Sequence, residues 1–151
     1  MKKADFLSKL KNEGKIELVQ PSEEIKISYL YKSENCLKSA KILFQNNLYE
    51  NSTSEAYYCM YNSVLALLFK VGIKSENHSA SILILKNIFN EELLYKIISH
   101  AKEERIDKQY YVETQQTIKA TKESCNEMII AAEDFLLKVK LLISQVNKKT
   151  L

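Results

Sequence analysis

The stretch EERIDKQYYVE, residues 103–113, gathers residue types that are well suited to holding an anion. Arg105 is the sole arginine of the chain, Asp107 follows it closely, and Tyr110 and Tyr111 are adjacent. A guanidinium can hold a phosphate through two parallel hydrogen bonds, and a tyrosine can stack on a base or donate its hydroxyl. These four residues form the predicted ligand surface. The alternative is structural: the guanidinium pairs with Asp107 or a nearby glutamate, and the tyrosine rings pack against neighbouring helices.

The two histidines are the other candidates for proton transfer, because imidazole titrates near neutral pH. His78 lies in the polar junction KSENHSA, four residues after Lys74, where it can cap the next helix or face a cleft. A structural role is the favoured interpretation for it. His100 stands at helical spacing from Lys96 and Glu104, as expected on a solvated helix face. No metal-ligand motif or glycine-rich phosphate loop is present, so the sequence predicts neither a metal nor a cofactor.

Helical periodicity runs through the chain, which has only two glycines and one proline. Residues that favour tight β-turns are therefore scarce, and long helices with few loops are expected. Ser22 and Thr121 are predicted N-caps, and Gly14 is a predicted helix stop. The predicted helices cover about residues 3–12, 22–46, 54–72, 79–101 with a break at Asn90, and 121–146.

The segment SEAYYCMYNSVLALLFKVGIKSENH, residues 54–78, is apolar over most of its helical circumference. Its uninterrupted apolar run, 64–69, is far shorter than the roughly 20 residues that cross a bilayer. Such a helix needs packing partners on several sides, so it is predicted to be the centre of a bundle. Tyr57 and Tyr61 lie one turn apart. They are expected to bury their rings and to keep their hydroxyls in contact with solvent.

The chain as a whole is predicted to be one all-α domain, an antiparallel bundle of four to six helices. It has 151 residues, of which 46% are hydrophobic, enough for a single core. The domain is expected to span 1–151, with the bundle core over about 22–147 and an N-terminal helix and linker over 1–21. The β-branched run SILILKNIF also suits a strand, but no strand partner was evident. The number of apolar faces favours a homodimer.

The charge distribution, the cysteines and the N-terminal residues limit the classes of function and indicate the cellular compartment. The net charge of +3 arises from interspersed acidic and basic residues, whereas proteins that read nucleic-acid sequence usually cluster arginines on a basic face. The three cysteines are widely separated and are interpreted as small buried hydrophobes. The N-terminus lacks the apolar segment of a signal peptide, so a cytoplasmic protein without membrane contact is expected.

The order of these features resembles the HEPN family. The matching parts are KSAKILFQNNLYENSTSEAYYCMYNSVLALLF, then GIKSENHSA, then ERIDKQYY, and a closing helix with AAEDFLLKV, over about residues 25–143. The resemblance implies a dimeric antiparallel bundle with a cleft near the dimer interface. It also implies metal-independent RNA cleavage in toxins, or pairing with a small nucleotidyltransferase that neutralises such toxins.

One part of the family pattern is missing. Family ribonucleases carry a histidine after the arginine with four to six residues between the two, but the matching positions after Arg105 hold Tyr110, Tyr111 and Val112. Tyrosine, with a pKa of about 10, is a poor base at neutral pH, and loss of a positioned base lowers a rate by about 10²- to 10⁴-fold. The first hypothesis is therefore a partner module in a toxin–antitoxin type of system. It would bind RNA, a nucleotide or a nucleotidyltransferase through the surface of Arg105, Asp107, Tyr110 and Tyr111. Lys74 and His78 are further candidate ligand-binding residues.

Two alternatives stay open at this point. In one, the protein is a metal-independent endoribonuclease toxin in which His78 replaces the missing histidine. In the other, it is a structural dimeric module in which EERIDKQYY holds helices together.

Overall fold

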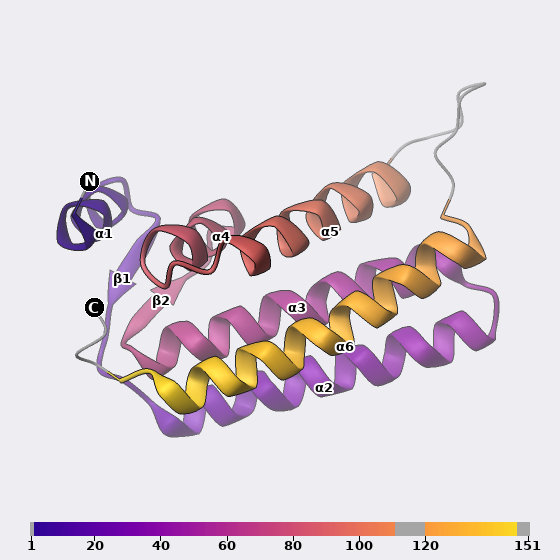
Figure 1. The fold of residues 1–151 in the computed structure, drawn as a ribbon, viewed down its shortest axis with the longest axis horizontal. Coiled ribbons are helices and arrows are strands. Elements are labelled where there is room, and N and C mark those ends of the chain that lie inside the picture. Colours follow the sequence, from indigo (N-terminus) through magenta and orange to yellow (C-terminus); the bar gives the residue numbers. More distant parts are fainter. Residues whose placement is uncertain (1, 111–119, 148–151) are drawn as a thin grey trace.

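The chain folds into an antiparallel helical bundle, which confirms the predicted all-α class (Figure 1). The structure is a computed structural model that describes residues 2–110 and 120–147, with side chains described to residue 106 in the first range. Its elements are α1 Lys3–Asn12, β1 Ile16–Leu18, α2 Glu23–Gln45, α3 Tyr49–Lys70, β2 Ile73–Ser75, α4 His78–Asn87, α5 Glu92–Tyr110 and α6 Lys122–Gln145.

Most helix ends lie close to where the local sequence signals predict them, but α5 runs to Tyr110, well past the predicted end near Ala101. The Ser22 hydroxyl accepts the Ile25 N–H at 3.1 Å, and Thr121 forms a reciprocal capping box with Ser124. The helical region after Ser79 divides as expected, because Asn90 adopts a left-handed conformation with φ of 58° between α4 and α5. The start of α3 differs: the helix begins at Tyr49, so part of the predicted polar connection is helical.

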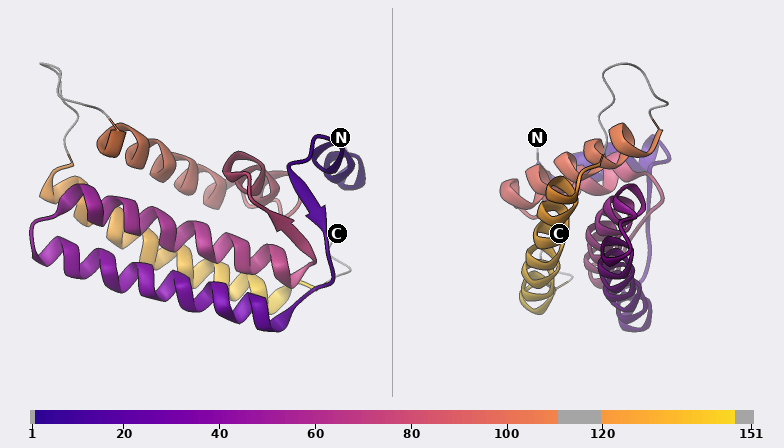
Figure 2. Two further views of the ribbon diagram at one scale, coloured as in Figure 1. Left: turned by 180° about the vertical axis from the view of Figure 1, so that it is seen from behind. Right: turned by 90° about the vertical axis from the view of Figure 1, so that its right-hand side faces the viewer.

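Helix α3 occupies the centre, as the sequence predicts. It packs against α2, α4, α5 and α6, and 15 of its 22 residues are buried. Figure 2 shows α2, α3 and α6 running side by side, with α5 over them and α4 at one end. Small residues allow α2 to lie close to α3. The hydroxyls of Ser33 and Ser52 donate hydrogen bonds at 2.6 Å to backbone carbonyls of the opposite helix. Within the described ranges, no helix is both long and apolar enough to cross a membrane.

A short β-ladder is the main departure from the predicted fold. Strands β1 and β2 pair antiparallel, with Ile16 opposite Ser75 and Leu18 opposite Ile73. The segment predicted as a linker thus contains a strand, and its partner lies in the junction before His78. Both Ile16 and Ile73 are buried in the same hydrophobic core as the bundle. The ladder therefore fixes the start of α4 against the end of α3.

The cysteines behave as the sequence indicates. Cys59 and Cys125 are buried and Cys36 is half-buried, and all three are free thiols. Burial raises the pKa of Cys59 to about 11 and that of Cys36 to about 12. The thiols of Cys36 and Cys59 are therefore protonated at neutral pH, a form in which a thiol is a poor nucleophile.

The turn after α3 yields the first prediction, a large loss of stability for Gly72→Ala. Gly72 has φ of +84°, and an added Cβ would lie 2.5 Å from the Val19 carbonyl oxygen. Backbone strain and this clash together predict a loss of roughly 3 kcal/mol or more in the free energy of unfolding. Gly14→Ala is the matched control, because Gly14 has φ of +71° but open space around it, so strain alone should cost about 1 to 2 kcal/mol. Urea denaturation measures both values, and equal losses would contradict the prediction.

Candidate functional site

The central feature of the candidate site is a group of three tyrosines on α3 that surrounds His78. The Tyr57 hydroxyl lies 2.7 Å from His78 Nδ1, and the Tyr61 ring stacks on the imidazole with centroids 3.8 Å apart. The Tyr58 ring meets the same imidazole edge-on at 6.3 Å. The prediction that Tyr57 and Tyr61 keep their hydroxyls in contact with solvent is wrong, since Tyr57 is 0% exposed and Tyr61 is 5% exposed. Their hydroxyls are satisfied inside the protein instead of by solvent.

A buried hydroxyl network holds the beginning of α4 in place beside these rings. Ser81 Oγ lies 3.1 Å from the Tyr61 hydroxyl, 2.8 Å from Ser75 Oγ and 2.9 Å from the Asn77 carbonyl oxygen. The Asn77 side chain caps α4 by accepting the Ala80 N–H at 2.8 Å. His78, the first residue of α4, is therefore positioned by both a cap and a side-chain network.

Two cations of α5 reach the same region. The Arg105 guanidinium carbon lies 5.1 Å from the centroid of Tyr57 and 5.3 Å from that of Tyr58, and its Nη1 donates to the Tyr58 hydroxyl at 3.2 Å. Lys102, one turn earlier, donates to Ser79 Oγ at 2.8 Å. We call Lys102, Arg105 and the adjacent His78 the cationic junction, because it lies where α4 meets α5.

The environment sets the protonation of these groups. Burial lowers the pKa of His78 below its ordinary 6.5, and the positive charges of Arg105 and Lys102 lower it further. Burial also raises the pKa of Tyr57 and Tyr61 above the ordinary 10. At neutral pH the site thus combines two cations, a neutral imidazole and protonated phenols.

This combination suits anion binding and one type of proton transfer. Lysine and arginine can hold a phosphate, and a neutral imidazole can accept a proton. Because Nδ1 of His78 is bonded to Tyr57, a base at Nε2 requires the tautomer in which Nδ1–H donates to the tyrosine oxygen. No group of metal-ligating side chains occurs in the described residues.

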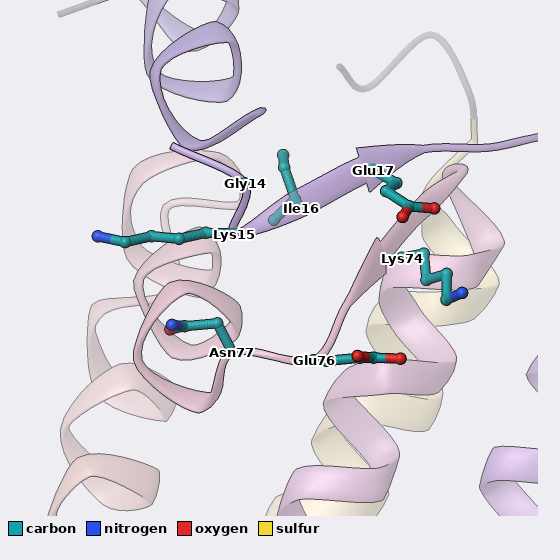
Figure 3. A pocket seen from close by; sticks show the side chains of 7 residues that line it. All are labelled: Gly14, Lys15, Ile16, Glu17, Lys74, Glu76 and Asn77. Atoms are coloured by element: carbon teal, nitrogen blue, oxygen red, sulfur yellow. The ribbon is translucent and has the colours of Figure 1, made fainter. Parts of the chain in front are cut away.

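The remaining residues of the predicted surface are distributed differently. Asp107 and Tyr110 belong to the last turn of α5, and Tyr111 lies outside the described residues. Lys74 lies on β2, whereas the tyrosine group lies on α3. Lys74 lines a hollow whose volume is about 280 Å³. Figure 3 shows Lys74 among the side chains around this hollow. That hollow is lined by Gly14, Lys15, Ile16, Glu17, Lys74, Glu76 and Asn77.

His100 lies on a solvated helix face, as predicted. Its side chain is 70% exposed, and Nε2 lies 3.8 Å from a Glu104 carboxylate oxygen one turn along α5.

Sequence reasoning missed the tyrosines of α3 and Lys102 as members of the site. Two signals were available: Tyr57 and Tyr61 share one helix face by their spacing of four, and Lys102 and Arg105 share another by their spacing of three. Neither signal reveals that the two faces meet, because that depends on how α4 and α5 pack against α3.

Comparison with known proteins gives consistent matches over most of the chain. The model of the HEPN domain matches residues 28–142. A protein of Methanocaldococcus jannaschii named "Putative toxin MJ0605" is 30% identical over 129 residues, which cover 82% of this chain and 92% of that protein. The crystal structure of ST0689, an archaeal HEPN homologue, is 25% identical with a TM-score of 0.60, covering 78% of this chain and 97% of that one.

The electrostatic coupling at the site yields a prediction for His78. We expect its imidazole to titrate with a midpoint below 6.5, and Arg105→Gln to raise that midpoint because a nearby positive charge is removed. In the wild-type protein the pKa of His78 is lower in the folded chain than in the unfolded chain, so the unfolded chain binds more protons once the pH falls below 6.5. Protonation of His78 therefore lowers the free energy of unfolding in that pH range. Imidazole proton shifts in NMR spectra follow the titration, and His100→Gln assigns the second signal. Lys138→Gln, on α6, is the control. A midpoint at or above 6.5, or one unchanged by Arg105→Gln, would refute the coupling.

Proposed function

The chain belongs to the HEPN family, and from this we propose that it is a toxin–antitoxin-related protein that binds the phosphate backbone of RNA through the cationic junction. The support is the convergence of Lys102, Arg105 and His78 at one place in the structure. The relative from Methanocaldococcus jannaschii, whose name describes a toxin, supports the toxin-related part of the proposal.

The single observation that carries the proposal is the seating of Arg105 against two tyrosine rings. Cation–π contacts with Tyr57 and Tyr58 and a hydrogen bond to the Tyr58 hydroxyl restrict the position of the guanidinium. A guanidinium held in this way loses less conformational entropy when it binds a phosphate. Arg105 and Tyr58 are both only partly buried, so the group borders on solvent. Arginine and lysine side chains are frequent partners of backbone phosphates in nucleic-acid complexes.

Other parts of the predicted function stay predictions. Asp107 and Tyr110 would extend the proposed surface along the last turn of α5, and Tyr111 stays a predicted member of it. A homodimer and a small nucleotidyltransferase partner also stay untested proposals.

Removal of the guanidinium gives the direct test. We expect Arg105→Gln to weaken binding of single-stranded RNA about tenfold, because charged hydrogen bonds are lost. The salt dependence of the binding constant should fall by about one unit of slope, the value for one phosphate contact. Fluorescence anisotropy at several salt concentrations measures both quantities.

The matched control is Lys138→Gln, which removes one positive charge from an ion pair with Asp134 on α6. It should leave the affinity within about twofold, as expected for an exposed pair. Circular dichroism verifies the fold of both variants. Unchanged affinity in a folded Arg105→Gln protein would contradict the proposal, and unfolding of this variant would support the structural interpretation of Arg105.

A second candidate function is metal-independent RNA cleavage, and one specific observation favours it. His78 and Arg105 both contact Tyr57, so a neutral imidazole lies close to a guanidinium although the usual sequence motif is incomplete. In such a reaction Nε2 of His78 would accept the proton of the 2′-hydroxyl, whose oxygen attacks the phosphorus. The bond between phosphorus and the 5′-oxygen breaks, and the leaving oxygen takes up a proton from solvent to give a 5′-hydroxyl. Arg105 would stabilise the charge that develops on the phosphate.

This second function predicts cleavage of single-stranded RNA in the presence of a chelator, with 2′,3′-cyclic phosphate ends. His78→Gln should lower the rate by about 10² or more, the usual effect of losing a positioned base. His100→Gln is the control and should retain the wild-type rate, since that side chain is 70% exposed on another face. RNA that stays intact on gel electrophoresis, while still binding, would eliminate cleavage and leave the binding function in place.

A further inference from the structure

We propose that the groove between α4 and α5 is a nucleobase subsite, so that the protein binds an unpaired base next to the phosphate held at the cationic junction. The inference rests on the proposed RNA-binding function and specifies the ligand as single-stranded. It concerns residues that the sequence reasoning did not assign to any site.

The groove adjoins the cationic junction through shared residues. Its volume is about 400 Å³, within the range of small-molecule sites. Lys102 and Ser79, which are hydrogen-bonded to each other, form its edge on the His78 side. The lining residues are Ser79, Ile82, Leu83, Tyr95, Ser99, Lys102, Glu103 and Ile106. A ligand in the groove would therefore lie directly beside the lysine that is proposed to hold a phosphate.

The lining matches the surface of a base rather than that of a phosphate. Ile82, Leu83 and Ile106 give apolar walls, which suit the faces of a planar ring. Tyr95 adds an aromatic side chain, whose ring lies 5.1 Å from the Lys86 ammonium. Ser79, Ser99 and Glu103 provide hydroxyls and a carboxylate that can hydrogen-bond to base edges. The negative charge of Glu103 disfavours a second phosphate, so the base is the part of the ligand that fits.

Duplex RNA does not expose the face of a base, which is the part of the ligand that the groove is proposed to bind. Bases in an A-form helix are stacked and paired, and proteins read such duplexes through the backbone and the shallow minor groove. A groove that takes the face of a base selects nucleotides that are already unstacked. We therefore expect the subsite to discriminate single-stranded RNA from duplex RNA.

The test compares two probes that have the same phosphates. One is a fluorescent single-stranded RNA of about eight nucleotides, within the site size of single-strand-binding grooves, and the other is an abasic strand of the same length. We expect the wild-type protein to bind the abasic strand about tenfold or more weakly, the scale of one or two stacked bases. A duplex of the same sequence should bind no better than the abasic strand.

A variant that fills the groove tests whether the difference in affinity between the two strands arises in the groove between α4 and α5. Ser99→Phe should lower the affinity for the base-bearing strand to that for the abasic strand, while leaving the latter unchanged. Ser144→Phe, which adds the same ring at an exposed position on α6, should retain the wild-type difference. Circular dichroism verifies both folds, and the comparison of probes on the wild-type protein needs no variant.

The outcomes separate this inference from the function on which it rests. Equal and measurable affinities of the wild-type protein for both strands would overturn the subsite and leave phosphate binding intact. Absence of binding to either strand would overturn both proposals. A difference between strands that persists in folded Ser99→Phe protein would show that the base is bound elsewhere, which also overturns the assignment to this groove.

Discussion

The structure depends on the need to satisfy the polar groups of a helix that is buried on most sides. Helix α3 lies at the centre of the bundle, and it carries three tyrosines near the middle of its length. A buried hydroxyl without a partner costs about 1 to 3 kcal/mol, so each phenol requires a group brought by a neighbouring helix. His78 meets Tyr57, Ser81 meets Tyr61, and Arg105 meets Tyr58. All three partners come from α4 and α5. The packing of these helices onto α3 therefore also assembles the candidate site.

This arrangement makes the same contacts serve the fold and the chemistry. The stacking of His78 on Tyr61 shields the imidazole partly from water, which helps to lower its pKa and so favours the neutral form. The rings that cover Arg105 restrict its motion and leave the guanidinium at the border with solvent. Tyr57 is fully buried and is bonded to His78, so its role in stability cannot be separated from its role in placing the imidazole. Tyr58 is half-buried, and its contact with Arg105 belongs more to the site than to the core.

Sequence patterns predicted the parts of this structure that depend on local interactions. The caps at Ser22 and Thr121, the break at Asn90 and the central position of α3 all follow from residue types at helical spacing. The pairing of β1 with β2 was missed because each strand has three residues, and they lie more than fifty positions apart, with no turn signal to join them. The meeting of His78 with Arg105 entered the sequence analysis only as an alternative, because no local pattern specifies it. The family motif counts forward along one helix, whereas this histidine comes from an earlier helix and reaches the arginine through the α3 tyrosines.

The proximity of the cations to His78 has a consequence for the two candidate functions. Without a ligand, the positive charges of Arg105 and Lys102 lower the pKa of the imidazole and so weaken it as a base. A phosphate bound between these cations would compensate their charge and raise that pKa, because binding of the anion and of the proton are thermodynamically coupled. Binding would then make His78 a better proton acceptor only after a phosphate had arrived. If the proton of the neutral imidazole is on Nε2 rather than on Nδ1, the protein would bind RNA without cleaving it. The direction of the hydrogen bond between His78 and Tyr57 therefore separates RNA binding from RNA cleavage.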